Sequence, residues 1–300
     1  VLPPHRLETP ARLTGRAGRS ALKPALADEM VQSMFATAPI DTTLFDALLG
    51  ARRYHGRRHV IADDLDQQPM TYGGLITASY ALGSVLAART RPGERVGVLL
   101  PTSCGALVTF FALQAVGRVP AMLNFSTGST SLQAACRAAE IAIVLTSRRF
   151  VEKAKLEALV GAVATSATVV YLEDLRPEVG LGAKLRGLWA SFTAHGRTDA
   201  VRAAEPAVVL FTSGSEGTPK GVVLSHRNLL ANRHQLAAVV DINRTDVVLN
   251  ALPVFHSFGL TGGLLLPLLN GVRTFLYPSP LHYRTVPELA YGLNATILFG

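Results

Sequence analysis

The sequence predicts an α/β fold in which βαβ units build mainly parallel sheets. Short runs rich in β-branched and apolar residues alternate with helical segments between residues 59 and 175, at a spacing typical of βαβ units. The 300 residues are 49% hydrophobic and 17% charged, enough for one large core or two smaller ones. The net charge of +8 indicates an acidic partner: nucleic acid, an anionic membrane face, a phosphorylated ligand or an acidic protein.

Residues 1–38 differ from the rest of the chain. They are polar and basic before Ala21 and then apolar at helical spacing, at Leu22, Leu26, Met30 and Met34. We expect a basic linker followed by a short helix, attached to something upstream. The polar face of this helix is not strongly cationic, which disfavours a helix that lies on a membrane.

The alternating region begins with a predicted hairpin at 59–64 and 68–75, where Thr71 is the expected N-cap of a helix. Further strands are predicted at 95–101, 119–124, 141–147 and 168–174, with helices near 103–116, 130–139 and 150–160. Residues 175–204 are expected to form a connecting segment or a surface helix.

The second half opens with strands at 207–213 and 220–225. Ser225 is the expected N-cap of the helix that follows, because Leu229 and Leu230 fall on one face while Asn232 and Arg233 fall on the other.

Two apolar runs, 96–117 and 247–272, carry no Asp, Glu, Lys or Arg and are long enough to cross a bilayer. Pro101 interrupts the first, and Pro253, Pro267 and the pair Gly262-Gly263 interrupt the second. We therefore predict buried core at both. The cysteines, Cys104 and Cys136, lack the spacing of a disulfide framework or a zinc site, which favours a reducing cytosolic setting.

The stretch "FTSGSEGTPKG" (211–221) carries the residue types of a phosphate-binding loop. Its glycines allow successive backbone N–H groups to turn toward one anion, its Ser and Thr hydroxyls add donors, and Lys220 adds a point charge. An ordinary Gly/Ser turn is the alternative, but the order of residues is more specific than a turn requires. A Walker A loop is excluded because Gly221 and a strand follow Lys220.

This order of residues resembles the phosphate-binding signature of the adenylate-forming (AMP-binding) superfamily, which includes acyl-CoA synthetases, luciferases and peptide-synthetase adenylation domains. "LPVFHSFGL" (252–260) resembles the next motif of that superfamily, in which the position of His256 lies beside the acyl pocket. Taken alone, a histidine among Phe and Leu is more often a core residue. Because His256 follows the phosphate loop by thirty-odd residues, we interpret it as a pocket residue.

The resemblance implies that residues 39–300 form part of an N-terminal adenylate-forming domain, with the C-terminal lid domain absent from this chain. It implies catalytic roles for Lys220 and His256, with ATP and Mg²⁺ as cofactors and no metal ligand from this chain. The implied ATP phosphate-binding residues are Thr212, Ser213, Gly214, Ser215, Gly217, Thr218 and Lys220. The implied acyl-pocket residues are Phe255, His256, Phe258, Gly259, Leu260 and Gly262.

Finer features resemble one subfamily. "FTSGSEGTPKGVVLSHRNLLAN" and "LYPSPLHYRTVPEL" are similar to the synthetase half of the bifunctional 2-acylglycerophosphoethanolamine acyltransferase/acyl-(acyl-carrier-protein) synthetases, which carry the pair Ser215-Glu216 where most of the superfamily has two threonines. Because a carboxylate facing a triphosphate would be repelled, Glu216 is expected to point away or to touch the metal shell.

This subfamily resemblance implies activation of a long-chain fatty acid, transfer to acyl carrier protein, and reacylation of a lysophospholipid by an acyltransferase domain upstream of residues 1–38. It implies a bacterial cytoplasmic protein in contact with the inner membrane. Two alternatives stay open: a carboxylate–CoA ligase, and a non-enzymatic, membrane-associated interaction fragment, against which the intact loop argues.

Two weaker patterns are set aside. The basic runs 51–59 and 147–149 lack an aromatic stacking platform, so no nucleic acid is expected and a solvated face is the default. His59 and Asp64 match the bare HxxxxD spacing of glycerolipid acyltransferases, but both fall in a predicted strand, and we interpret the match as coincidence.

Overall fold

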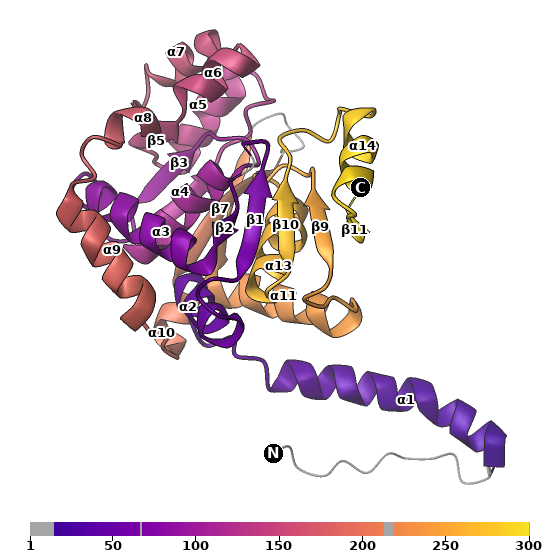
Figure 1. Cartoon of the computed structure of the whole chain (residues 1–300). Coiled ribbons are helices and arrows are strands. Elements are labelled where there is room, and N and C mark those ends of the chain that lie inside the picture. Colours follow the sequence, from indigo (N-terminus) through magenta and orange to yellow (C-terminus); the bar gives the residue numbers. More distant parts are fainter. Residues whose placement is uncertain (1–14, 67, 213–218, 300) are drawn as a thin grey trace.

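The computed structural model describes residues 15–66, 68–212 and 219–299, and these residues form two sheets (Figure 1). One sheet has the order β6-β5-β3-β4-β7-β8: β3 (Arg95–Val98), β4 (Val119–Met122), β5 (Ile143–Thr146), β6 (Thr168–Tyr171), β7 (Pro206–Thr212) and β8 (Lys220–Ser225). The other has the order β11-β9-β10-β1-β2: β1 (Val60–Asp64), β2 (Met70–Thr71), β9 (Val247–Asn250), β10 (Arg273–Leu276) and β11 (Ile297–Leu298).

Pairing within both sheets is mainly parallel. Only β8 on β7 and β2 on β1 pair antiparallel among the described strands, and both lie at sheet edges. The predicted α/β class with βαβ units is confirmed, as is the hairpin of β1 and β2.

The helices of the described residues are α1 (Gly15–Ala36), α2 (Leu44–His55), α3 (Tyr72–Ala87), α4 (Cys104–Ala115), α5 (Ser129–Ala138), α6 (Arg148–Ala154), α7 (Glu157–Val163), α8 (Leu172–Leu175), α9 (Leu181–Thr193), α10 (Ala200–Ala204), α11 (His226–Val239), α12 (Ser257–Leu260), the π-helix η1 (Thr261–Leu265), α13 (Leu266–Leu269) and α14 (Thr285–Gly292).

The helices and sheets stack in layers. The largest core fills the space between the two sheets, where α4 contacts β3 and β4 of one sheet and β1 of the other. A second core packs α5 and α7 on the opposite face of the six-stranded sheet. A third packs α14 against β9 and β10 on the outer face of the five-stranded sheet. Each sheet is thus covered on both faces, as parallel sheets require.

Local signals in the sequence set several helix starts. Thr71 accepts the Gly74 N–H at 3.1 Å and begins α3, as predicted. Ser225 accepts the Asn228 N–H at 3.1 Å and begins α11 with a reciprocal capping box. These side-chain oxygens satisfy N–H groups that the first helical turn leaves without a partner.

Three expectations differ from the structure. The helix predicted near 150–160 is two helices, because Lys155 adopts the left-handed conformation (φ 54°) between α6 and α7. Arg233, predicted on the polar face of α11, turns inward and donates to Leu269 O and Asn270 Oδ1 at 3.0 and 2.6 Å. Within the basic run 51–59, Arg52 is buried rather than solvated.

Both apolar runs lie mainly in the interior, as predicted. Residues 96–117 provide β3 and α4, and 247–272 provide β9, α12, η1 and α13. Across 15–66, 68–212 and 219–299, no helix combines the length and hydropathy needed to cross a bilayer.

The predicted N-terminal helix is present as α1. It runs away from the body of the molecule (Figure 1), contacts α11, and leaves Leu26, Met30 and Met34 exposed. The basic stretch before it, residues 1–14, lies outside the described residues, and the assignment of 1–38 as a linker stays a prediction.

Candidate functional site

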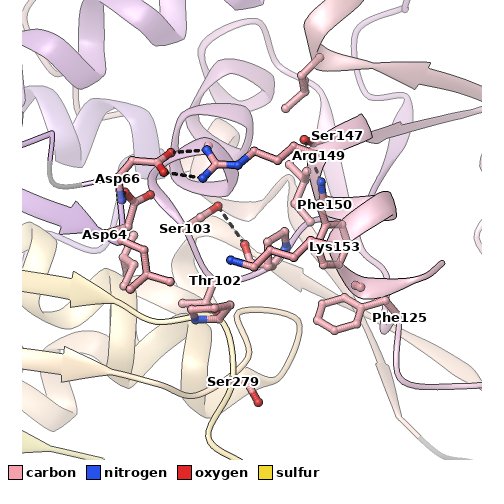
Figure 2. Close-up of a pocket in the computed structure, with 18 of the residues that line it drawn as sticks. Asp64, Asp66, Thr102, Ser103, Phe125, Ser147, Arg149, Phe150, Lys153 and Ser279 are labelled. Carbon is pink, nitrogen blue, oxygen red and sulfur yellow. Dashed lines mark hydrogen bonds and ion pairs between the residues drawn. The ribbon is translucent and has the colours of Figure 1, made fainter. Parts of the chain in front are cut away.

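The carboxyl ends of strands from both sheets meet around one cavity of about 650 Å³ (Figure 2). Asp64 ends β1, Thr102 and Ser103 follow β3, Ser147 follows β5, and Ser279 follows β10; all five line the cavity. In open α/β sheets, ligands bind outside the carboxyl ends of the strands. The location and size of this cavity therefore suit a small-molecule site.

Several charged groups line the cavity, and two of them, Asp66 and Arg149, pair with each other. The Arg149 guanidinium donates to both Asp66 oxygens at 2.9 and 3.0 Å, as Figure 2 shows, and this contact lowers the pKa of Asp66. Asp64 accepts the N–H groups of Cys104 and Asp66 at 2.8 and 3.0 Å. Lys153 also lines the cavity. The lining therefore combines carboxylates held by hydrogen bonds with three cations, Arg149, Lys153 and Arg176.

Glu173 lines the same cavity from α8. Its burial would raise the pKa, but the Ser147 hydroxyl, donating at 2.7 Å, and backbone N–H groups including those of Arg148 and Arg149 outweigh burial and lower it. The carboxylate is therefore held ionised beside the end of β5.

Apolar rings connect the cavity to the His256 motif. Phe125 and Phe150 line the cavity with their rings 5.0 Å apart; Phe125 also meets Phe255 edge-on at 5.0 Å, and the Phe255 ring lies 4.7 Å from that of His256. Phe255 is buried, whereas His256 is exposed at the start of α12. The exposed imidazole has no hydrogen bond to the described part of the chain, so His256 is not a satisfied core histidine.

Two of the remaining predicted acyl-pocket residues, Gly259 and Gly262, pack against their own segment. A Cβ on Gly259 would lie 2.2 Å from Pro253 O, and one on Gly262 would lie 2.8 Å from the Phe258 ring. Leu260 is buried in the central core and Phe258 is half exposed. The described lining of the 650 Å³ cavity contains none of the six predicted residues. Their role in acyl binding stays a prediction.

The phosphate loop is described only at its ends. Thr212 ends β7 and Lys220 begins β8, and the two residues are cross-strand partners with exposed side chains. Ser213, Gly214, Ser215, Glu216, Gly217 and Thr218 lie outside the described residues. Because β7 runs parallel to β4, which leads to Phe125, Thr212 and Lys220 lie at the cavity edge of the sheet. A strand follows Lys220, as predicted.

No metal-ligand cluster accompanies this arrangement: residues 15–66, 68–212 and 219–299 place no three His, Cys, Asp or Glu side chains so as to hold a metal ion. Mg²⁺ usually binds through one or two carboxylates together with substrate phosphates, so Mg²⁺ stays an expectation from the resemblance.

The two residues of the HxxxxD match lie apart in the structure. His59 and Asp64 flank β1 at opposite ends; His59 Nε2 lies 2.7 Å from Gly271 O, while Asp64 bonds to Cys104 N–H. The two side chains have different partners, in agreement with coincidence.

Sequence reasoning missed most of the cavity lining, including Asp64, Arg149 and Phe125. One signal was available, since Asp64, Thr102 and Ser147 each stand at or just beyond the end of a strand. The order of strands in two separate sheets was needed to bring these ends together.

A family model supplies the decisive comparison: the model of the AMP-binding enzymes matches residues 50–300. The chain belongs to this family. It is 27% identical over 216 residues to the medium-chain fatty-acid–CoA ligase of Escherichia coli (strain K12), covering 69% of this chain and 37% of the relative. It is 24% identical over 234 residues to the long-chain-fatty-acid–CoA ligase of Bacillus subtilis (strain 168), covering 70% and 42%.

Solved structures with a similar fold agree with membership of the AMP-binding enzymes. The ATP-bound MatB from Rhodopseudomonas palustris has a TM-score of 0.67 at 26% identity and covers 86% of this chain and 48% of its own. The anthranilate CoA ligase AuaEII in complex with anthranoyl-AMP has a TM-score of 0.71 at 18% identity, covering 89% and 50%, a likeness of fold alone. The chain spans less than half the length of the two fatty-acid ligases named above.

Proposed function

We propose that this chain forms part of a ligase that activates a fatty acid with ATP. One observation carries the proposal. The two ends of the phosphate loop lie at the same edge of a sheet as a cavity, and aromatic rings connect this cavity to His256. Membership of the AMP-binding enzymes supports the same chemistry.

In the proposed reaction, the fatty-acid carboxylate attacks the α-phosphorus of ATP. A carboxylate O–P bond forms, the bond from the α-phosphorus to the pyrophosphate oxygen breaks, and acyl-adenylate and pyrophosphate result. Negative charge gathers on the phosphate oxygens, so Lys220 and the loop donors would act by neutralising and positioning them. Mg²⁺ is an expectation from the resemblance, and no step here runs through it.

The apolar part of the cavity suits an acyl chain. Leu100, Phe125, Phe150, Leu172 and Leu276 line it, and a volume of about 650 Å³ lies in the range of small-molecule sites. The acyl chain would lie among these side chains, and the row of rings through Phe255 would lead its carboxylate toward His256, which we infer to be a positioning residue for that end.

The acceptor of the acyl group is the finer question. We propose the phosphopantetheine thiol of acyl carrier protein, with onward transfer to a lysophospholipid by an acyltransferase domain at the cytoplasmic face of the inner membrane, on the basis of the Ser215-Glu216 subfamily pattern. Coenzyme A is the second candidate, favoured by the CoA-ligase names of the relatives.

The acceptor test uses the product of the gene's full reading frame. Fatty-acid-dependent AMP release is measured with phosphopantetheinylated carrier protein or with coenzyme A. Release driven by the carrier protein supports the proposal, whereas release driven only by coenzyme A assigns the chain to the CoA ligases. If neither acceptor supports fatty-acid-dependent AMP release, the proposed activation of a fatty acid is itself contradicted.

The loop is tested by Lys220→Ala, with the exposed Lys23→Ala on α1 as the matched control. We expect fatty-acid-dependent ATP/pyrophosphate exchange to fall about 10²-fold in the first variant, as when one well-aimed donor is removed, and to be unchanged in the second. Equal exchange in both variants would remove Lys220 from the mechanism.

A further inference from the structure

Helix α9 turns its large apolar side chains toward solvent. Leu181, Leu185, Leu188, Trp189 and Phe192 are 73%, 56%, 40%, 72% and 57% exposed. Their spacing places them on one side of the helix. We call these five residues the α9 face. Contiguous exposed apolar surface of this kind marks an interaction site.

The opposite side of α9 is made of small residues and packs on α3. Gly187 and Ser191 are buried there, and a Cβ on Gly187 would lie 2.6 Å from Thr77 O, so the two helix backbones approach closely. The usual pattern, with large apolar residues inside, is therefore reversed.

Specific contacts hold α9 in this orientation. The buried Arg52 donates to the carbonyl oxygens of Ser191 and Ala194 at the end of the helix. Arg57 donates from Nε to Ser191 Oγ at 3.1 Å, and its guanidinium lies 3.9 Å above the Phe192 ring. The outward direction of the α9 face is thus fixed by several independent interactions.

The charge around the α9 face is positive. The helix contains Lys184 and Arg186, both exposed, and no Asp or Glu. The acidic residue that precedes it, Glu178, is paired with Arg89. Long cationic side chains beside Trp, Phe and Leu are typical of helices that lie in the interface of an anionic membrane.

We propose that the α9 face is a membrane-binding surface that lies in the headgroup region of an anionic lipid bilayer. A convex ridge of five apolar side chains suits the deformable interface of a bilayer, and Trp189 is of the residue type enriched there. A folded acidic partner would need several charge pairs, for which α9 itself offers Lys184 and Arg186 alone. The inference does not depend on the ligase activity.

The first test is co-sedimentation of the full-length protein with vesicles of phosphatidylcholine, with and without phosphatidylglycerol. We expect binding to the anionic vesicles and at least a tenfold loss in Leu185→Ser/Trp189→Ser. Lys184→Gln/Arg186→Gln should lose about fivefold per charge, hence about 25-fold. The matched control is Leu26→Ser/Met30→Ser on α1, two similarly exposed apolar residues, which should bind as the unaltered protein does.

The second test uses Trp189, the one tryptophan of the 300 residues. The emission difference between the protein and Trp189→Phe isolates this side chain. With anionic vesicles, the Trp189 emission should move to shorter wavelength and should be quenched by brominated lipid. With phosphatidylcholine alone, the Trp189 emission should not change.

Three results would overturn the proposal. One is vesicle binding that the α1 variant loses and the α9 variants keep. Another is Trp189 emission that is already at short wavelength without lipid, which would mean that other parts of the full-length protein cover the α9 face. The third is loss of carrier-protein binding in the α9 variants while vesicle binding persists. Adenylation of a water-soluble short-chain acid without vesicles should stay intact in the α9 variants, so a failed surface is distinguishable from a failed ligase.

Discussion

Helices α4 and α9 show that an apolar composition and an apolar surface are different properties. The sequence of α4 has no charged residue, and the helix lies between the two sheets with Phe111 fully buried. Helix α9 contains Lys184, Arg186 and two glycines, yet it exposes five large apolar side chains. The difference comes from the partners: α4 has layers on both sides, whereas α9 packs mainly on α3.

The largest expected effect lies in α4. Phe111→Ala should lower the free energy of unfolding by about 3–5 kcal/mol, because it removes a fully buried ring and leaves a cavity among residues packed on all sides. Urea denaturation of the full-length protein measures the change. A loss below about 1 kcal/mol would show that this space is not closely packed.

Burial also disfavours the charged form of a side chain, and His226 tests this through pH. The buried ring accepts the Leu44 N–H at Nδ1 at 3.1 Å, and burial lowers its pKa to about 4. Because the folded pKa lies below the unfolded value of about 6.5, the contribution is fully present above pH 6.5 and is lost as pH falls toward 4, by up to about 3 kcal/mol.

The measurement for His226 is a pair of stability profiles against pH, one for the protein and one for His226→Gln. Their difference isolates this histidine from His234, whose pKa burial also lowers to about 4. An NMR titration that places His226 near 6.5 would contradict a buried, neutral imidazole.

Two glycines of α9 are expected to respond in opposite directions. Gly187→Ala should destabilise by about 1–3 kcal/mol, since the new Cβ would meet Thr77 O at 2.6 Å. Gly182→Ala has open space around it and should stabilise by about 0.5–1 kcal/mol, because alanine favours the helix. Equal thermal shifts in the two variants would mean that α9 does not pack on α3 as described.

Much of the fold was predictable because its signals are local. Alternating strands and helices, and the caps Thr71 and Ser225, depend on neighbouring residues. The break at Lys155 was not predictable, since a non-glycine residue in the left-handed conformation has no clear sequence marker. The outward direction of α9 was not predictable either, because helical spacing defines a face without saying which face has a partner.

The candidate site divides in the same way. Lys220 and His256 were predicted from contiguous motifs, and their roles stay predictions. The pairing of Asp66 with Arg149 joins residues 83 positions apart, and the row from Phe150 through Phe125 to Phe255 joins three distant segments of the chain. Such contacts follow from strand order and layer stacking, which one sequence does not specify.

The smallest expected effect completes the comparison of α4 with α9. Phe192→Ala removes the same atoms as Phe111→Ala, but this ring is 57% exposed and its defined contact is the Arg57 guanidinium. A cation–π contact at an exposed site contributes about 0.5–1 kcal/mol, so the free energy of unfolding should fall by no more than that. If urea denaturation gave a loss near that of Phe111→Ala, the α9 face would be covered in the full-length protein. A covered α9 face would not be free to bind a membrane.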